Sequence, residues 1–288
     1  PEDRTDWSGV ANFDVKLADL GNVNASFSHS RPNFHMIENR FGNRISTTNW
    51  TVTVQGNLEK FAPASFSEMK VPITFTHAEY MENPEYVANN DIKLEEAAES
   101  ARRQAIQQGF SEQEAEEIAN NIRLRSQTLR VQDSWALTGV RLGIPSSFWL
   151  VNQTINRVTF GYSYSQEFLR SPLYAERFNW LWQFTAQYGV QIPDILSFNP
   201  TSWLADVPML GIYNKLKINI LPVSFNYSFN LMRRRTTEQS RYLEYPSPVY
   251  RDFSAQQQAQ LNWKLAEGGL LNPTIDYSVT TRSTLVPL

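Results

Sequence analysis

The feature that most constrains the fold of this chain is an alternation of side chains over Val223 to Leu231, which reads VSFNYSFNL. Its odd-numbered positions are Val, Phe, Tyr, Phe and Leu, and its even-numbered positions are Ser and Asn. Because successive side chains of a β-strand point to opposite faces, this pattern predicts a strand with one aromatic and aliphatic face and one small, polar face. These nine residues, when tilted, also have about the length that crosses a bilayer as one β-strand.

The residues on either side of this stretch set its predicted limits. Pro222 precedes it, at the start of a strand, where the missing backbone N–H is tolerated. Arg233, Arg234 and Arg235 follow it, and we interpret them as a charged turn that ends the strand. The alternative is that these three residues and Arg241 bind lipid phosphates or an acidic partner.

The same alternation recurs along the chain, most clearly over Arg157–Phe168 and Arg177–Val190. Shorter stretches of the same kind are Asn12–Leu17, Asn22–Ser28, Asn49–Gly56, Val71–Thr76, Gln258–Leu265 and Thr274–Thr280. Over the three clearest stretches we expect the following side chains to face lipid: Val158, Phe160, Tyr162, Phe178, Trp180, Trp182, Phe184, Phe225, Tyr227 and Phe229. The sequence therefore predicts a mainly β fold built of antiparallel strands.

The composition of the opposite face favours a membrane barrel over a soluble sheet. That face consists repeatedly of Ser, Thr, Asn, Gln and Gly. A soluble sheet exposes more Lys and Glu there, whereas the lumen face of a membrane barrel is polar and its outer face carries aromatic girdles. We therefore predict a section of a large outer-membrane β-barrel, with strands and loops over residues 1–87 and 129–288. The alternative is a soluble cell-surface β-sandwich that acts as a binding module.

Between these two regions, the stretch 88–128 changes from β to helical character. Residues from Asp91 to Gln108 are rich in Glu, Ala, Arg and Gln, and Gly109 ends this run. Ser111 with Glu114 forms a capping-box pattern that opens a second helix to about Arg125. Eight acids face three bases between Asp91 and Glu117, so we expect a charged helical hairpin that lies on the water side of any membrane.

Nothing in the sequence indicates catalysis, a cofactor or a metal. The chain contains no Cys, no Gly-rich phosphate loop and no G-x-S-x-G motif. Its three histidines, His29, His35 and His77, do not stand in a ligand pattern with a third partner, and we interpret them as ordinary residues. A net charge of −3 argues against nucleic-acid binding, and no apolar run is long enough for a transmembrane helix.

The order of several short motifs resembles the SprA (Sov) family of giant outer-membrane translocons. The motifs are Asn22-Val23-Asn24-Ala25-Ser26-Phe27, a loop ending Ile37-Glu38-Asn39-Arg40, Gly56-Asn57-Leu58-Glu59-Lys60-Phe61-Ala62-Pro63, Pro72-Ile73-Thr74-Phe75, Asn83-Pro84-Glu85-Tyr86 with Asn90-Asp91, and Leu221-Pro222-Val223-Ser224-Phe225-Asn226-Tyr227-Ser228 before the Arg cluster. Trp263, in a Gln- and Asn-rich strand, suits the segment that follows.

The resemblance implies a function that the residue pattern alone does not. It implies that the chain is a section of the outer-membrane translocon of the type IX secretion system, a noncatalytic channel that passes cargo proteins to the surface of a Gram-negative, Bacteroidetes-like cell. Implied partners are membrane lipid or lipopolysaccharide, secreted cargo, and plug and lateral-gate proteins, and an implied associated process is gliding motility. The alternative function is that of another large outer-membrane transport barrel.

Overall fold

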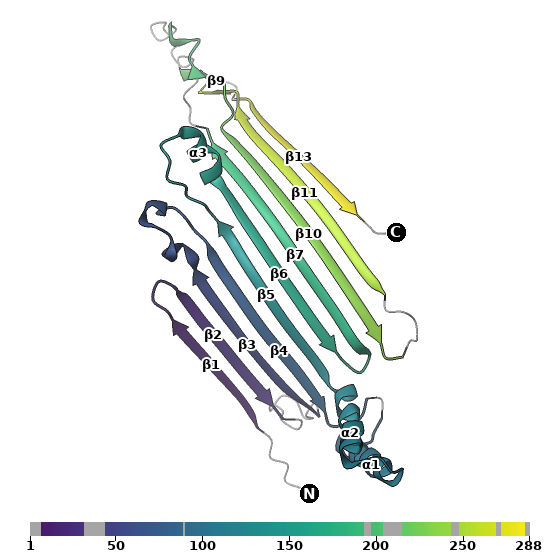
Figure 1. Cartoon of the computed structure of the whole chain (residues 1–288). Coiled ribbons are helices and arrows are strands. Elements are labelled where there is room, and N and C mark those ends of the chain that lie inside the picture. Colours follow the sequence, from purple (N-terminus) through teal and green to yellow (C-terminus); the bar gives the residue numbers. More distant parts are fainter. Residues whose placement is uncertain are drawn as a thin grey trace.

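Most of the chain forms one large antiparallel β-sheet. The computed structural model describes residues 7–31, 44–88, 90–192, 197–203, 215–242, 248–268 and 272–285. Within these ranges the large sheet has ten strands in the order β1-β2-β3-β4-β5-β6-β7-β10-β11-β13, so each strand pairs with the next long strand in the chain (Figure 1). The mainly β, antiparallel fold predicted from the alternating patterns is therefore confirmed.

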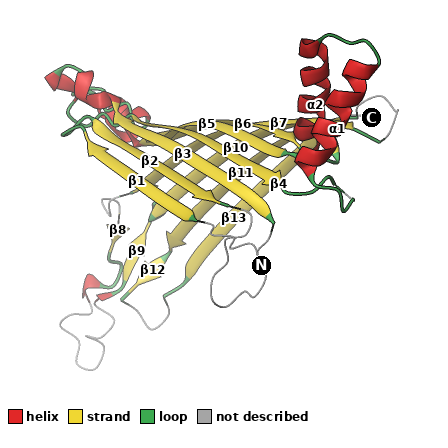
Figure 2. Cartoon of the chain, turned by 90° about the horizontal axis from the view of Figure 1, so that it is seen from below, coloured by secondary structure: helices red, strands yellow, loops and turns green. Residues whose placement is uncertain are grey.

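The strands of the large sheet are long, from 9 residues in β1 to 18 residues in β7. Their bounds are β1 Ser8–Lys16, β2 Gly21–Ser30, β3 Ile45–Asn57, β4 Pro72–Pro84, β5 Thr128–Val140, β6 Val158–Arg170, β7 Tyr174–Gln191, β10 Ser224–Ser240, β11 Val249–Lys264 and β13 Thr274–Leu285. A small sheet of β8 Ser197–Phe198, β9 Lys217–Asn219 and β12 Ala266–Glu267 lies beside one end of the large sheet (Figure 2).

Two sequence predictions about strands need correction. The strand β5 was not predicted, although Leu129, Val131, Trp135 and Leu137 do alternate, because Asp133 stands in the middle of the apolar series. The three arginines Arg233 to Arg235 do not end their strand, because β10 continues through them to Ser240.

The arginines stay within β10 because the neighbouring strands continue beside them. Arg233, Arg234 and Arg235 pair with Trp182, Leu181 and Trp180 of β7, so their backbone groups remain in the hydrogen-bonded ladder. The arginine run is therefore part of the sheet, and the turn to β11 comes after Ser240. The charged-turn interpretation is wrong, since a strand ends where pairing ends and not where charge begins.

A helical hairpin is inserted between β4 and β5 at the opposite end of the sheet from the small sheet (Figures 1 and 2). Its helices are α1 Leu94–Gln107 and α2 Glu112–Ser126, and the predicted capping box of Ser111 and Glu114 is present at the start of α2. A shorter helix, α3 Trp149–Gln153, precedes β6. In the described part of the chain no helix is both long and apolar enough to cross a membrane.

The two helices of the hairpin pack through small side chains and are joined by charges. The buried residues at their contact are mostly alanines, Ala98 and Ala105 of α1 and Ala115 and Ala119 of α2. Small side chains allow the helix backbones to approach closely, so this contact depends on the absence of larger groups. The guanidinium of Arg123 also donates to both carboxylate oxygens of Glu95, at 3.2 and 2.9 Å, which links α2 to α1.

Enlarging a buried alanine should loosen the hairpin. We expect Ala115→Leu to lower the free energy of opening of α1 and α2 by about 1–3 kcal/mol, because added methylenes overpack a close contact. Native-state hydrogen exchange of the helix amides measures this free energy. The exposed residue Gln113 provides the control, and Gln113→Leu should leave the protection unchanged. Equal protection in the two variants would contradict close packing of the alanines.

The capping box should make the start of α2 sensitive to acid. Hydrogen bonds from the Ser111 backbone N–H and hydroxyl lower the pKa of Glu114 below its ordinary value of 4.5. Because the unfolded helix binds the proton more readily, this stabilisation is complete above that ordinary value and is lost as the pH falls through the lowered pKa. The protection factors of the first-turn amides of α2, which are corrected for the intrinsic exchange rate, should therefore fall over this range, and Glu114→Gln should abolish this fall.

Candidate functional site

The strand register gathers the large hydrophobic side chains on one face of the sheet, which we name the apolar face. Directly paired residues of antiparallel strands point to the same side, so each row of pairs can be followed across the sheet. The row through Leu231 continues to Phe184, Tyr162 and Leu137. Its rings also meet across strands, with ring centroids 6.3 Å apart for Phe160 and Phe184 and 6.5 Å for Phe184 and Phe229.

All ten side chains predicted to face lipid belong to this apolar face. The register places together Val158, Phe160, Tyr162, Phe178, Trp180, Trp182, Phe184, Phe225, Tyr227 and Phe229. Several large side chains of the same face remain open, and Trp135 and Tyr162 have exposed fractions of 48% and 42%. The shared face is a property of the structure, and its contact with lipid stays a prediction.

The opposite side, which we name the polar face, carries Ser, Thr, Asn and Gln from neighbouring strands. Their side chains bond across the sheet, with Gln183 Nε2 donating to Asn230 Oδ1 at 3.0 Å and Thr236 Oγ1 donating to Asn179 Oδ1 at 2.9 Å. Amide and hydroxyl groups both donate and accept hydrogen bonds, so the side chains of the polar face can bond to one another and also to water.

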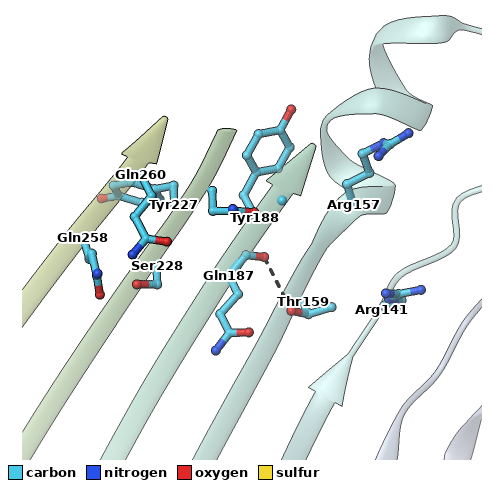
Figure 3. Close-up of a pocket in the computed structure, with 11 residues that line it drawn as sticks. Arg141, Arg157, Thr159, Gln187, Tyr188, Tyr227, Ser228, Gln258 and Gln260 are labelled. Carbon is cyan, nitrogen blue, oxygen red and sulfur yellow. Dashed lines mark hydrogen bonds between the residues drawn. The ribbon is translucent and has the colours of Figure 1, made fainter. Parts of the chain in front are cut away.

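A cavity of about 370 Å³ lies on the polar face where β6, β7, β10 and β11 run side by side (Figure 3). Figure 3 shows Gln187 and Tyr188 leaving β7 on opposite sides, which is the alternation that separates the two faces. Thr159 Oγ1 donates to the Gln187 carbonyl at 3.5 Å. Ser228, Gln258 and Gln260 add uncharged polar groups to the lining, and Arg141 and Arg157 add two positive charges.

The apolar residues form a diagonal band across the sheet, not a band perpendicular to the strands. One row of pairs is apolar from Val54 of β3 to Trp182 of β7, and it then reaches Arg233 on β10. Six residues further along β7, the row through Tyr188 and Tyr227 is apolar up to Val279 of β13. The band therefore shifts along the strands from β3 to β13, as it does where strands are tilted to a planar apolar layer.

One polar cluster interrupts the apolar face. His77 Nδ1 of β4 lies 2.5 Å from Asp133 Oδ1 of β5, and Gln166 Nε2 of β6 donates to Asp133 Oδ2 at 3.1 Å. The ring of Trp50 covers the imidazole, with centroids 4.6 Å apart. This cluster was not predicted from the sequence. The signal that could have revealed it is Asp133, which stands at a position where the alternation of β5 requires an apolar residue.

The four arginines proposed as one binding cluster do not come together. Arg233 and Arg235 lie on the apolar face and Arg234 on the polar face, because strand neighbours alternate. The Arg233 guanidinium lies over the Trp180 ring at 5.6 Å, a cation–π contact that satisfies it locally. Arg241 lies beyond β10 and donates from Nε to the carbonyl of Ser171 at 3.0 Å.

The remaining chemistry-bearing side chains do not gather into a metal or catalytic site. His29 contacts the hydroxyl of Thr48 at 2.9 Å, and His77 belongs to the polar cluster above. His35 lies outside the described residues. Among the described residues, no group of three or more metal-ligating side chains is found.

Breaking the polar cluster from one side should cost more than replacing it. We expect Asp133→Leu to lower the free energy of unfolding by about 1 kcal/mol or more, because His77 and Gln166 lose their acceptor. The double variant with His77→Leu should recover part of this loss, since an apolar pair fits the face. Thermal unfolding of the purified protein measures both, with Ser134→Ala on the opposite face as the control. A double variant less stable than the single one would contradict this account.

The comparisons with known proteins bear on the N-terminal part of the chain. Residues 2–98 match the family model of the SprA N-terminal region, described as a motility-related and secretion protein. A comparison with curated proteins finds no match. The matched residues span β1 to β4 and the start of α1, which include most of the motifs that carried the resemblance in the sequence. Residues 2–98 of the chain thus belong to the SprA family of motility-related and secretion proteins.

Proposed function

We propose that this chain forms part of the wall of a protein-conducting channel in the outer membrane, the translocon of the type IX secretion system. The observation that carries the proposal is the diagonal apolar band on one face of a sheet whose other face is polar. In this function the apolar face meets lipid and the polar face lines the channel. The protein acts by enclosing a path and not by catalysis.

The sheet supplies what lipid demands of a backbone. A membrane-spanning segment has no water to satisfy its N–H and C=O groups, so each must pair within the protein. The inner strands of the large sheet, β2 to β7 with β10 and β11, are paired on both sides, over stretches that include 13-residue and 17-residue strands. The edges β1 and β13 then require further strands, which we propose come from the rest of a closed barrel.

The apolar face is uncovered, which favours a sheet in contact with lipid over one sheet of a soluble sandwich. A sandwich buries the apolar face of one sheet against a second sheet about 10 Å away. In the described part of the chain, the small three-stranded sheet lies beside one end of the large sheet and does not cover this face (Figure 2). Trp135 and Tyr277 therefore keep exposed fractions of 48% and 59%, a cost that lipid would remove.

The polar face suits a channel that passes many different cargo proteins. Its central rows carry uncharged Ser, Thr, Asn and Gln, such as Ser228, Asn230 and Gln258. Such groups hold water without a strong charge or apolar patch to which a passing protein would adhere. We infer that cargo moves along this wetted surface. Lipid or lipopolysaccharide outside, and plug and lateral-gate proteins at the channel, are the partners that we propose.

Paired cysteine substitutions test which face meets lipid. The chain has no Cys, so Ser228→Cys and Phe229→Cys introduce single thiols on opposite faces of β10. In the full-length protein in intact outer membranes, we expect a water-soluble maleimide to label Ser228→Cys and a lipid-dissolved maleimide to label Phe229→Cys. Quantified labelling on denaturing gels measures both.

The control for reactivity is the same pair of variants after denaturation, where both thiols should react equally with the water-soluble reagent. Equal labelling of the two positions in the native membrane would contradict the assignment of the faces. Rapid labelling of Phe229→Cys by the water-soluble reagent alone would favour a soluble sheet.

A further inference from the structure

Three arginines far apart in the sequence meet at the end of the sheet that bears the helical hairpin. Arg125 lies in the last turn of α2, Arg170 is the last residue of β6, and Arg241 directly follows β10. A cavity of about 420 Å³ lies between the end of α2, the start of β7 and the end of β10, and Arg125 and Arg241 line it together with Ser126, Tyr242 and others. Its volume is within the range of sites that hold small molecules.

The positive charges of these arginines are close enough to affect one another. Burial, and then the charges of Arg125 and Arg170, lower the pKa of Arg241 from its ordinary value. A guanidinium nevertheless stays protonated in proteins, so the three residues keep three like charges at one place. Such an arrangement costs free energy until an anion enters.

The described residues do not supply that anion. Arg123, Arg130 and Arg177 each form an ion pair with a glutamate, at 2.9, 2.5 and 3.0 Å respectively. By contrast, none of Arg125, Arg170 and Arg241 pairs with a carboxylate within the described ranges.

The partners that these arginines do have are neutral. Arg170 Nη2 donates to Gln127 Oε1 at 2.7 Å, and Arg241 Nε donates to the Ser171 carbonyl at 3.0 Å. The Nε of Arg170 is buried and has no hydrogen-bond partner. The last-turn carbonyls of α2 carry partial negative charge that favours Arg125, but this offsets one cation and not three.

We propose that Arg125, Arg170 and Arg241 form a binding site for a phosphate group. Phosphate offers several acceptor oxygens and up to two negative charges, which match guanidinium groups that converge from three elements. The group can come from a lipid headgroup or from free phosphate. The site lies beyond the row of Phe178 on β7, at the end of the apolar band, where headgroups would lie if that band meets lipid. The site itself does not depend on the channel function.

Binding of phosphate by the purified full-length protein tests the proposal. In detergent, isothermal titration with inorganic phosphate should show saturable binding that Arg125→Gln and Arg241→Gln each weaken roughly tenfold, the loss of about one charge-assisted contact. In nanodiscs of phosphatidylcholine with or without phosphatidic acid, native mass spectrometry should show retained phosphatidic acid that both variants lose. The first arm detects free phosphate and the second a lipid headgroup.

Two controls distinguish the loss of the binding site from a general loss of positive charge and from a loss of folding. Arg103→Gln removes an exposed arginine of α1 and should leave binding by the protein unchanged. The Arg125 side chain makes no hydrogen bond to a described residue, so Arg125→Gln should keep the thermal unfolding temperature of the wild type. Absence of binding in both arms, or equal binding by wild type and Arg125→Gln, would overturn the proposal, and neither result would bear on the faces of β10.

Discussion

The cross-strand register is the constraint on which the rest of the structure depends. Each strand separates apolar from polar side chains by alternation alone, but pairing decides whether neighbouring strands place the same class on the same side. Over most of the large sheet they do so, with exceptions such as Asp133 and Arg233 on the apolar face, so one mainly apolar and one mainly polar surface result. A slip of one residue in any pair would transfer a whole strand's aromatic side chains to the polar face.

The diagonal course of the apolar band connects this register to function. If the strands stood perpendicular to the membrane, the apolar band would follow the same rows of directly paired residues from one edge of the sheet to the other. Instead the apolar rows move by six residues between Trp182 and Tyr188 of β7 as the band passes toward β13. Tilted strands are what closure of a barrel requires, so the pattern of side chains agrees with the channel wall that we propose.

Charged side chains within the sheet differ from those at its end in whether they have partners. On the apolar face, His77, Asp133 and Gln166 satisfy one another across three strands, and Arg233 lies over Trp180. At the end that bears the helical hairpin, Arg125 and Arg241 lack carboxylate partners among the described residues. The first arrangement is closed and suits a surface away from water, whereas the second is open to a ligand.

Local sequence patterns determined the strands, the helical hairpin and the capping box of Ser111 and Glu114. These depend on periodicity and on contacts three residues apart, which the sequence displays directly. The strand β5 was not predicted because Asp133 interrupts its apolar series. Asp133 can stand there because it contacts a partner on β4 that is 56 residues away in the sequence.

Tertiary structure alone decided which arginines meet. Sequence proximity suggested Arg233 to Arg235, but alternation sends neighbours to opposite faces and the ladder carries the strand past them. The arginines that do converge, Arg125, Arg170 and Arg241, come from a helix, a strand and a turn. Pairing register brings such distant residues together, and no periodicity within one segment records it, because register is a property of two strands and not of one.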